Sequence, residues 1–310
     1  MKIAFVFPGQ GSQTVGMMDA WSGDAAVQAT LQAGNDALGE DLRGLIAHGP
    51  AETLNLTTHT QPAMLLCSVA MYRAWREAGG AEPALVAGHS LGEYSALVAA
   101  GSLDLADAVR TVRVRAQAMQ SAVPVGEGTM AAIIGLDDDA VRQACAQAEQ
   151  GQAVEAVNFN APGQVVIAGH TGAVARACDL AKAAGAKRAL ALPVSAPFHS
   201  RLLEPAARVL AGTLAGIVVA PPRIPLINNV DVAQPTAPAD VRDALVRQAW
   251  HPVRWVETIM AMKQAGVTHI VECGPGKVLS GLTRRIDRDI QSFNITDPAS
   301  LQQTLEALGG

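Results

Sequence analysis

A serine between glycines, in the stretch Gly88-His89-Ser90-Leu91-Gly92, is the residue of this chain best placed to do chemistry. It separates a short apolar run from a stretch with helical character, which matches the G-x-S-x-G pattern of a nucleophile elbow. Glycines leave room where the strand and the helix approach closely, and the Leu91 N–H points at developing negative charge. The pattern predicts Ser90 as a nucleophile with the Leu91 N–H in its oxyanion hole. Taken alone, it is equally compatible with a serine that only caps a helix.

A serine hydroxyl needs an adjacent base at neutral pH, and His199 is the candidate among the seven histidines. It lies in the proline-containing segment Ser195–Ser200, where the chain re-enters a large domain after an insert and opens a helix. Clefts form readily where two domains meet. We therefore predict His199 as the general base, against the alternative of a surface histidine at a helix start.

The glycine-rich segment Pro8–Gln13 follows a first apolar run, Ile3–Phe7, which is predicted to be a buried strand. It lacks both the G-x-G-x-x-G spacing and the lysine of phosphate-binding loops. An elbow takes a second oxyanion N–H from another loop at the same end of the sheet. Gln10 lies between two glycines, so the elbow makes its N–H a candidate donor; without the elbow, an ordinary turn is the better interpretation.

Two arginines border the apolar stripe of a helix predicted from Asp104 to Gln120. Arg113 and Arg115 lie on opposite borders, and either one can reach an anion beneath a neighbouring element. Each is also compatible with a surface arginine whose stem covers apolar surface. Periodicity does not choose between them.

Composition limits the class of protein. The 310 residues are 49% hydrophobic and 4% aromatic, which suits a large core of helices packed on parallel strands. The net charge of −5 argues against nucleic-acid binding. The four cysteines are scattered, as expected of buried thiols in a reducing compartment rather than metal ligands. No stretch is long enough for a signal-peptide core or a membrane span, so we expect a cytoplasmic protein without membrane partners.

The order of predicted elements indicates an α/β fold with one insertion. A parallel-sheet, hydrolase-like large domain is expected from residues 1–123 and 196–310, where strands and helices alternate. Residues 124–195 have the order β-α-β-β-α-β, typical of a ferredoxin-like subdomain. In the large domain we expect a helix over 24–47 and a strand over 224–229.

A helix is also predicted over Ala63–Trp75, with Pro62 at its first position.

A catalytic acid is missing from the expected place. An α/β-hydrolase has an acid in the chain between its serine and its histidine. The acidic residues between Ser90 and His199 fall in predicted helices or in the insert. The insert is itself foreign to that family, so a standard serine hydrolase fits poorly.

A set of motifs occurs in the order of one known family: Phe7–Gln13, Gln61–Ala63, Gly88–Glu93, Val114–Gln120, Asn158–Gln164 and Pro197–Ser200. From residue 3 to about residue 285, the chain resembles the malonyl-CoA:acyl carrier protein transacylases of bacterial type II fatty acid synthesis. The resemblance implies that Ser90 takes the malonyl group from malonyl-CoA and passes it to the phosphopantetheine thiol of acyl carrier protein. It implies no metal, and no cofactor, since malonyl-CoA is consumed as a substrate. Nothing in the sequence demands an assembly larger than a monomer.

The resemblance also implies a role for each catalytic group. Ser90 is the nucleophile, His199 is the general base that later returns the proton, and Gln248 orients the histidine in place of an acid. The backbone N–H groups of Gln10 and Leu91 form the oxyanion hole.

Substrate recognition is implied at two further positions. Arg115 rather than Arg113 pairs with the free carboxylate of the malonyl group, for which a planar guanidinium is suited. Gln61 matches a position in the pocket near the substrate. The chain departs from common family residues at Ala116 and His251, neither of which is a proposed catalytic group.

Alternatives share parts of this chemistry. The chain can be the malonyl-transferring subunit of a malonate decarboxylase or a stand-alone acyltransferase of polyketide synthesis, which differ in the carrier. A non-catalytic carrier-binding module is a third possibility, against which the presence of both Ser90 and His199 argues. For docking an acidic carrier, charge alone suggests Lys182, Lys187, Arg188, Arg284 and Arg285, which are otherwise a solvated surface.

Overall fold

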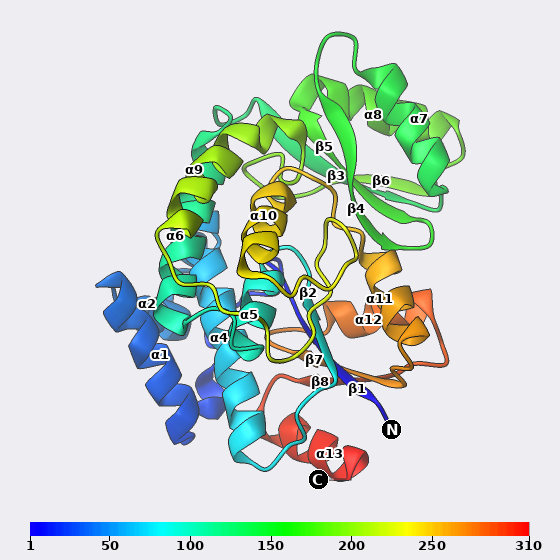
Figure 1. The fold of residues 1–310 in the computed structure, drawn as a ribbon. Coiled ribbons are helices and arrows are strands. Elements are labelled where there is room, and N and C mark those ends of the chain that lie inside the picture. Colours follow the sequence, from blue (N-terminus) through cyan, green and yellow to red (C-terminus); the bar gives the residue numbers. More distant parts are fainter. Residues whose placement is uncertain (310) are drawn as a thin grey trace.

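A four-stranded parallel sheet carries the serine elbow in the computed structural model, which describes residues 1–309 (Figure 1). The strand order is β2 (Leu85–Gly88), β1 (Ile3–Phe7), β7 (His269–Cys273) and β8 (Gln291–Ile295). All residues of β1 are buried, as expected for a strand covered on both faces of its sheet. Parallel strands end at the same edge, so the loops after β1 and β2 lie together there.

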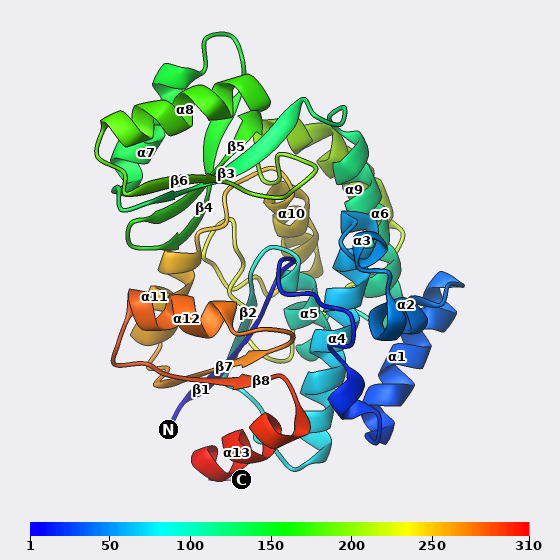
Figure 2. The ribbon, with the colours of Figure 1, turned by 180° about the vertical axis from the view of Figure 1, so that it is seen from behind.

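Helices cover both faces of this sheet (Figures 1 and 2). The helices of the chain are α1 (Ala25–Leu38), α2 (Leu42–His48), α3 (Ala51–Leu54), α4 (Thr57–Glu77), α5 (Gly92–Ala99), α6 (Leu105–Ser121), α7 (Asp138–Ala148), α8 (Thr171–Ala183), α9 (Glu204–Ala215), α10 (Pro238–Gln248), α11 (Trp255–Gln264), α12 (Val278–Ile286) and α13 (Pro298–Leu308). Alternate residues of β1 point to opposite faces. Phe5 and Phe7 join a core with α1, α4, α6 and α9, whereas Ala4 and Val6 join one with α11 and α12.

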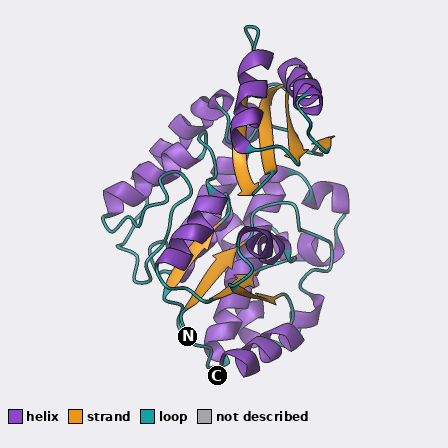
Figure 3. Cartoon of the chain, turned by 90° about the vertical axis from the view of Figure 1, so that its right-hand side faces the viewer, coloured by secondary structure: helices purple, strands orange, loops and turns teal. Residues whose placement is uncertain are grey.

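The second sheet is antiparallel and belongs to the inserted segment (Figure 3). Its strand order is β4 (Val154–Ala161), β5 (Gln164–His170), β3 (Gly128–Ile134) and β6 (Arg188–Ala191). Helices α7 and α8 pack on it around a core of their own. The chain order is β-α-β-β-α-β, so the predicted fold class, an α/β protein with a ferredoxin-like insertion, is confirmed.

Two predicted helices have different limits in the structure. The helix predicted over residues 24–47 is divided, because Gly39 adopts φ 66° and ends α1 with a left-handed cap before Asp41 caps α2. The long helix α4 begins at Thr57 rather than at Pro62, which lies inside it. Burial of most of α4 in the core outweighs the cost of an internal proline, about 3 kcal/mol.

The prediction of a strand over residues 224–229 is wrong. This segment makes only a single parallel bridge, between Leu226 and Val86. Pro225, directly before the bridge, has no N–H to donate to a ladder, which stops the pairing on that side. Beyond the bridge, the Asn229 N–H donates to Glu93, and the Gly88 carbonyl accepts from the Asn229 side chain instead. The segment instead continues as the loop that reaches the serine elbow. Within residues 1–309, the helices lack the combination of length and apolar character that crossing a bilayer requires.

Candidate active site

The serine lies on a sharp turn between β2 and α5. Ser90 has φ 53°, a left-handed conformation that costs a non-glycine residue energy. A Cβ atom on Gly88 would lie 1.9 Å from the Gly92 backbone, and one on Gly92 would lie 2.0 Å from the Phe7 carbonyl oxygen. Only glycine fits at both positions, so the predicted reason for the G-x-S-x-G spacing is present in the structure.

His199 lies directly beside this serine. Its Nε2 is 2.6 Å from Ser90 Oγ, and its Nδ1 is 2.8 Å from the backbone oxygen of Gln248. A carbonyl oxygen only accepts, so Nδ1 carries the hydrogen and Nε2 is left to accept the proton of the serine. A backbone carbonyl from the end of α10 thus occupies the position where a hydrolase has an acid.

The histidine is held in its neutral form. Burial lowers the pKa of His199 to about 3, and the positive charge of Arg115 lowers it in the same direction. A neutral imidazole can act as a base as soon as the substrate arrives. The His199 side chain is only 3% exposed, so little water surrounds its ring.

The Gln10 loop lies against the elbow. A Cβ atom on Gly9 would be 2.8 Å from the His89 carbonyl oxygen, so the two loops touch through their backbones. Thr57 holds the Gln10 side chain by donating to its Oε1 at 2.8 Å. Among residues 1–309, neither the Gln10 nor the Leu91 N–H donates to a protein acceptor, as an oxyanion hole requires.

Arg115 brings a cation to the serine from α6. Its Nη1 donates to Gln61 Oε1 at 2.7 Å, and its Nη2 donates to Ser90 Oγ at 3.3 Å and to Gln248 Oε1 at 3.0 Å. The guanidinium also lies over the ring of Tyr94, 5.6 Å from its centroid. With 2% exposure, Arg115 is a buried cation aimed at the nucleophile.

Arg113, the other arginine of the same helix, points elsewhere. It forms two hydrogen bonds with Glu40, at 2.5 and 2.9 Å. The structure therefore brings Arg115 and not Arg113 into the site, a choice that periodicity left open.

One cavity of about 120 Å³ collects most of the predicted site residues. It is lined by Gln10, Gln61, Ser90, Leu91, Arg115 and His199, together with residues of the inserted sheet such as Met130 and Asn158. Gln248 supports the cavity from behind, through the contacts described above. Within the described part of the chain, no cluster of His, Cys, Asp or Glu side chains could hold a metal ion.

Two residues of the site were missed by sequence reasoning. Asn229 accepts from the Ser90 N–H and donates to the Gly88 carbonyl, each at 2.7 Å, and so fastens both sides of the elbow. Glu93 accepts from the Asn229 N–H at 3.0 Å and from Gln248 Nε2 at 3.2 Å. Glu93 follows the G-x-S-x-G pattern directly, but nothing local indicates that it reaches residues so far along the chain.

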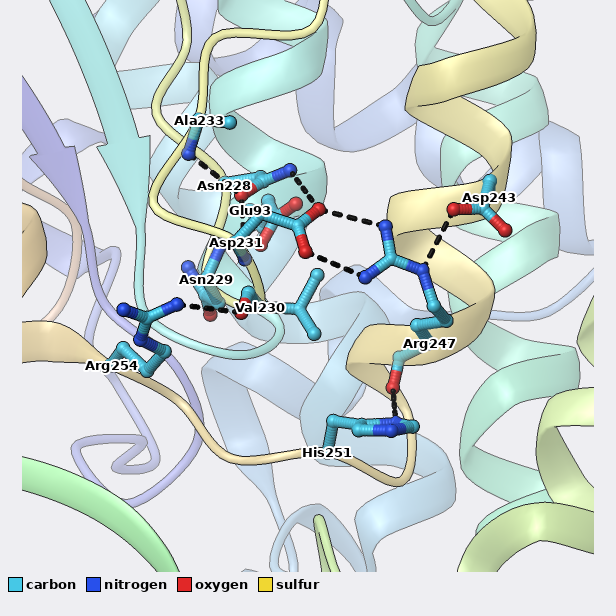
Figure 4. Close-up of polar contacts among 10 residues, drawn as sticks. All are labelled: Glu93, Asn228, Asn229, Val230, Asp231, Ala233, Asp243, Arg247, His251 and Arg254. Carbon is cyan, nitrogen blue, oxygen red and sulfur yellow. Dashed lines mark hydrogen bonds and ion pairs between the residues drawn. The ribbon is translucent and has the colours of Figure 1, made fainter.

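A polar network fixes the loop that carries Asn229 (Figure 4). Asp231 receives two hydrogen bonds at 2.7 Å from Arg247, the residue before Gln248. The Asn228 side chain accepts from the N–H groups of Asp231 and Ala233 and shapes the turn. The two residues that hold the elbow, Asn229 and Gln248, are thereby tied to each other.

Comparison with known proteins gives consistent relatives. Residues 4–295 match the family described as the acyl transferase domain. The chain is 55% identical, over 306 residues, to the malonyl CoA-acyl carrier protein transacylase of Escherichia coli strain K12, covering 98% of this chain and 99% of the relative. A solved acyl-carrier-protein S-malonyltransferase from Burkholderia pseudomallei is 60% identical with a TM-score of 0.97, covering 99% of this chain and 100% of that one. A malonyl-transacylase solved in complex with its type II PKS acyl carrier protein is 51% identical with a TM-score of 0.98, covering 99% and 100%.

Proposed function

The chain belongs to the acyl transferase family and, within it, to the malonyl-CoA:acyl carrier protein transacylases, and from this premise we propose the reaction that it performs. It transfers the malonyl group of malonyl-CoA to the phosphopantetheine thiol of acyl carrier protein, in fatty acid synthesis. The group waits on Ser90 between the two half-reactions. The proposal rests above all on the buried guanidinium of Arg115 beside the Ser90–His199 pair.

In the first half-reaction, Ser90 Oγ attacks the thioester carbon while its proton passes to His199 Nε2. The carbonyl oxygen becomes an oxyanion, which the N–H groups of Gln10 and Leu91 stabilise. As the tetrahedral intermediate collapses, the C–S bond breaks and His199 returns the proton to the sulfur of coenzyme A. Malonyl-Ser90 and free coenzyme A result.

The second half-reaction repeats these steps with a different thiol. His199 takes the proton of the phosphopantetheine thiol, whose sulfur attacks the ester carbon of malonyl-Ser90. The oxyanion forms in the same hole, and His199 then protonates Ser90 Oγ as the C–O bond breaks. The backbone oxygen of Gln248 keeps the imidazole in the required tautomer throughout.

Arg115 selects the acyl group. A guanidinium presents two parallel N–H donors that match a carboxylate, so the free end of a malonyl group is bound and oriented. Gln61 holds Nη1 of this guanidinium and so keeps its plane in place. An acetyl group has no carboxylate to replace these contacts, and a neutral-ester hydrolase has no use for the cation.

A second acceptor is favoured by one observation. The malonyl-transacylase that was solved with a type II PKS carrier resembles this chain as closely in structure as the others do. A polyketide carrier is therefore a candidate acceptor beside the carrier of fatty acid synthesis.

An acceptor competition tests the function. Three reactions each contain the protein, malonyl-CoA and one phosphopantetheinylated carrier: that of fatty acid synthesis, of polyketide synthesis or of malonate decarboxylase. The mass of each carrier is then measured by mass spectrometry. We expect rapid malonylation of the fatty acid carrier that depends on Ser90. Transfer to the decarboxylase carrier alone would contradict the proposed place in fatty acid synthesis.

For the protein as a whole, we propose a monomer that works in the cytoplasm without nucleic-acid or membrane partners. The net charge of −5 supports the absence of a nucleic-acid partner. Light scattering across a range of concentrations tests the monomer, because a concentration-dependent mass would contradict it.

A further inference from the structure

Glu93 is a buried acid that the proposed mechanism does not use. It lies in the first turn of α5, one helical turn beyond Ser90, and is 1% exposed. Its Oε2 accepts two hydrogen bonds, from the Asn229 N–H and from Gln248 Nε2. A buried carboxylate needs a reason, because burying a charge is costly unless that charge is paired.

The Gln248 side chain connects this acid to the substrate-binding cation. Its Oε1 accepts from Arg115 Nη2 at 3.0 Å, while its Nε2 donates to Glu93 Oε2 at 3.2 Å and to the Ser90 carbonyl at 2.7 Å. A guanidinium only donates and a carboxylate only accepts, so this orientation of the amide is dictated by its neighbours. One amide thus separates a buried cation from a buried acid.

The surroundings leave Arg115 as the uncompensated charge that faces Glu93. Asp231, from the loop of residues 228–233, faces Glu93 but is neutralised by its paired hydrogen bonds with Arg247 (Figure 4). On the other elements packed around them, His199 is neutral and burial raises the pKa of Tyr94, which keeps the phenol neutral. Among the described residues, the Arg115 guanidinium itself donates only to neutral oxygens.

We propose that Glu93 is the counter-ion of Arg115 in the free enzyme and takes up a proton from solvent when the malonyl carboxylate becomes the partner of Arg115. The inference rests on the proposed function, since it assigns the malonyl carboxylate to Arg115. Two carboxylates beside one buried cation cannot both stay ionised without cost. The proton returns to solvent when the malonyl group leaves with the carrier, so charge inside the site is balanced at each stage.

The ionisation of Glu93 falls in a range where the change is measurable. Burial raises the pKa of Glu93 to about 7, against the lowering effect of the hydrogen bonds from Gln248 and Asn229 and of the charge of Arg115. Above pH 7, Glu93 is mostly ionised in the free enzyme, and its negative charge opposes binding of the malonyl carboxylate. Malonyl binding must therefore weaken as the pH rises, by up to about fiftyfold between pH 7 and pH 9, because the protonated fraction of Glu93 falls from about one half to about one hundredth.

Isosteric variants test this coupling. Glu93→Gln keeps an oxygen that can accept from Asn229 and Gln248, but it cannot ionise. Glu272→Gln is the matched control, because Glu272 is also a fully buried carboxylate yet binds Leu279 and Ser280 at the start of α12, away from the site. The KM for malonyl-CoA in the loading step is measured from pH 7 to pH 9 for all three proteins, and proton uptake on loading is followed with a pH indicator at pH 8.

We expect the KM of the wild type and of Glu272→Gln to rise by up to about fiftyfold over this range, whereas that of Glu93→Gln stays flat. Since all three release the same coenzyme A, the excess proton uptake of the wild type over Glu93→Gln reports Glu93 itself. A flat wild-type KM, or an unchanged slope in Glu93→Gln, would overturn the inference while leaving malonyl transfer intact. If Glu93→Gln failed to fold, the wild-type slope for malonyl-CoA, compared with that for acetyl-CoA, would decide. Absence of malonyl loading in the wild type would instead remove the proposed function.

Discussion

Ser90 and His199 both hold positive φ angles, 53° and 66°, which non-glycine residues rarely adopt. Such conformations cost roughly 1–3 kcal/mol each and persist only where the surroundings enforce them. Here the Asn229 side chain binds both ends of the elbow, and Gln248 binds the Ser90 carbonyl and the His199 ring. The strained residues are those that must face each other for catalysis.

Replacement of Arg115 tests recognition of the malonyl carboxylate. Arg115→Ala removes a charged partner, so single-turnover loading from malonyl-CoA is expected to fall by roughly 10²-fold or more. Arg113→Ala is the matched control, because Arg113 lies on the same helix but pairs with Glu40. Quenched-flow measurement of the acyl-enzyme follows both variants. Similar losses in the two would refute a specific role for Arg115.

The low pKa of His199 predicts a dependence of stability on pH. An unfolded histidine titrates near 6.5, whereas burial lowers the pKa of His199 in the folded protein to about 3. Between these values the unfolded chain binds the extra proton, so the contribution is complete above pH 6.5 and is lost as the pH falls. From pH 7 to pH 5, the wild type should lose about 2 kcal/mol more unfolding free energy than His199→Gln. Urea unfolding at both pH values measures this difference, and parallel losses would contradict the prediction.

Single residues were predicted unevenly, for a physical reason. Ser90 and Gln10 belong to local motifs, so the sequence indicates where they lie, whereas the choice of Arg115 over Arg113 on one helix required the family resemblance. Asn229 and Glu93 act through hydrogen bonds between residues 136 positions apart, which no local pattern reveals. The group that orients His199 is the backbone carbonyl of Gln248. Since every residue has such a carbonyl, only the family resemblance could indicate this position.

At the scale of elements, the turn between β2 and α5 depends on the absence of side chains. Gly92→Ala would place a methyl group 2.0 Å from the Phe7 carbonyl oxygen, so either β1 or α5 must move. We expect a loss of about 3 kcal/mol or more in unfolding free energy. Gly281 lies in the exposed part of α12, and an added Cβ atom would meet no other atom within 4 Å. Gly281→Ala should therefore raise the unfolding free energy by about 0.5–1 kcal/mol. Thermal unfolding of the two variants compares them, and equal shifts would refute the steric account.

Most elements follow from periodicity, and the exceptions show what overrides it. An internal proline is tolerated in α4 because tertiary burial along the helix outweighs the missing hydrogen bond. The apolar residues of 224–229 resemble a strand but make only one bridge beside Pro225. That failure matters for function, because an extended loop there, rather than a sheet strand, lets Asn229 turn back to the elbow.

At the scale of the whole molecule, the site belongs to both sheets. The elbow and Arg115 come from the large α/β part, while Met130 and Asn158 of the inserted sheet, and Leu192 directly after it, line the same cavity. We propose that the chain divides as the sequence predicts, into residues 1–123 with 196–310 and an inserted 124–195. The inserted part then forms one wall of the cavity in which the acyl group is held.

Three of the basic residues suggested for carrier docking, Lys187, Arg188 and Arg285, lie at one end of the inserted sheet. Arg188 and Gln164 pair with the same residue of β3, and Arg285 from α12 donates to Gln164 at 2.6 Å. We expect the double change Lys187→Glu and Arg188→Glu to raise the KM for the carrier roughly tenfold and to leave that for malonyl-CoA unchanged. Arg43→Glu, on the remote helix α2 (Figure 1), serves as the control. An unaltered carrier KM in the double variant would eliminate this surface.

In the proposed reaction, Ser90 carries an acyl group that is selected by the carboxylate of the malonyl group. The most direct measurement treats the protein with malonyl-CoA or acetyl-CoA, quenches it in acid and maps the modified peptide by mass spectrometry. We expect one malonyl group on Ser90, far less acetyl label, and loss of the malonyl group when carrier is added. Equal labelling by the two donors, or a malonyl group on any residue other than Ser90, would contradict the proposed reaction.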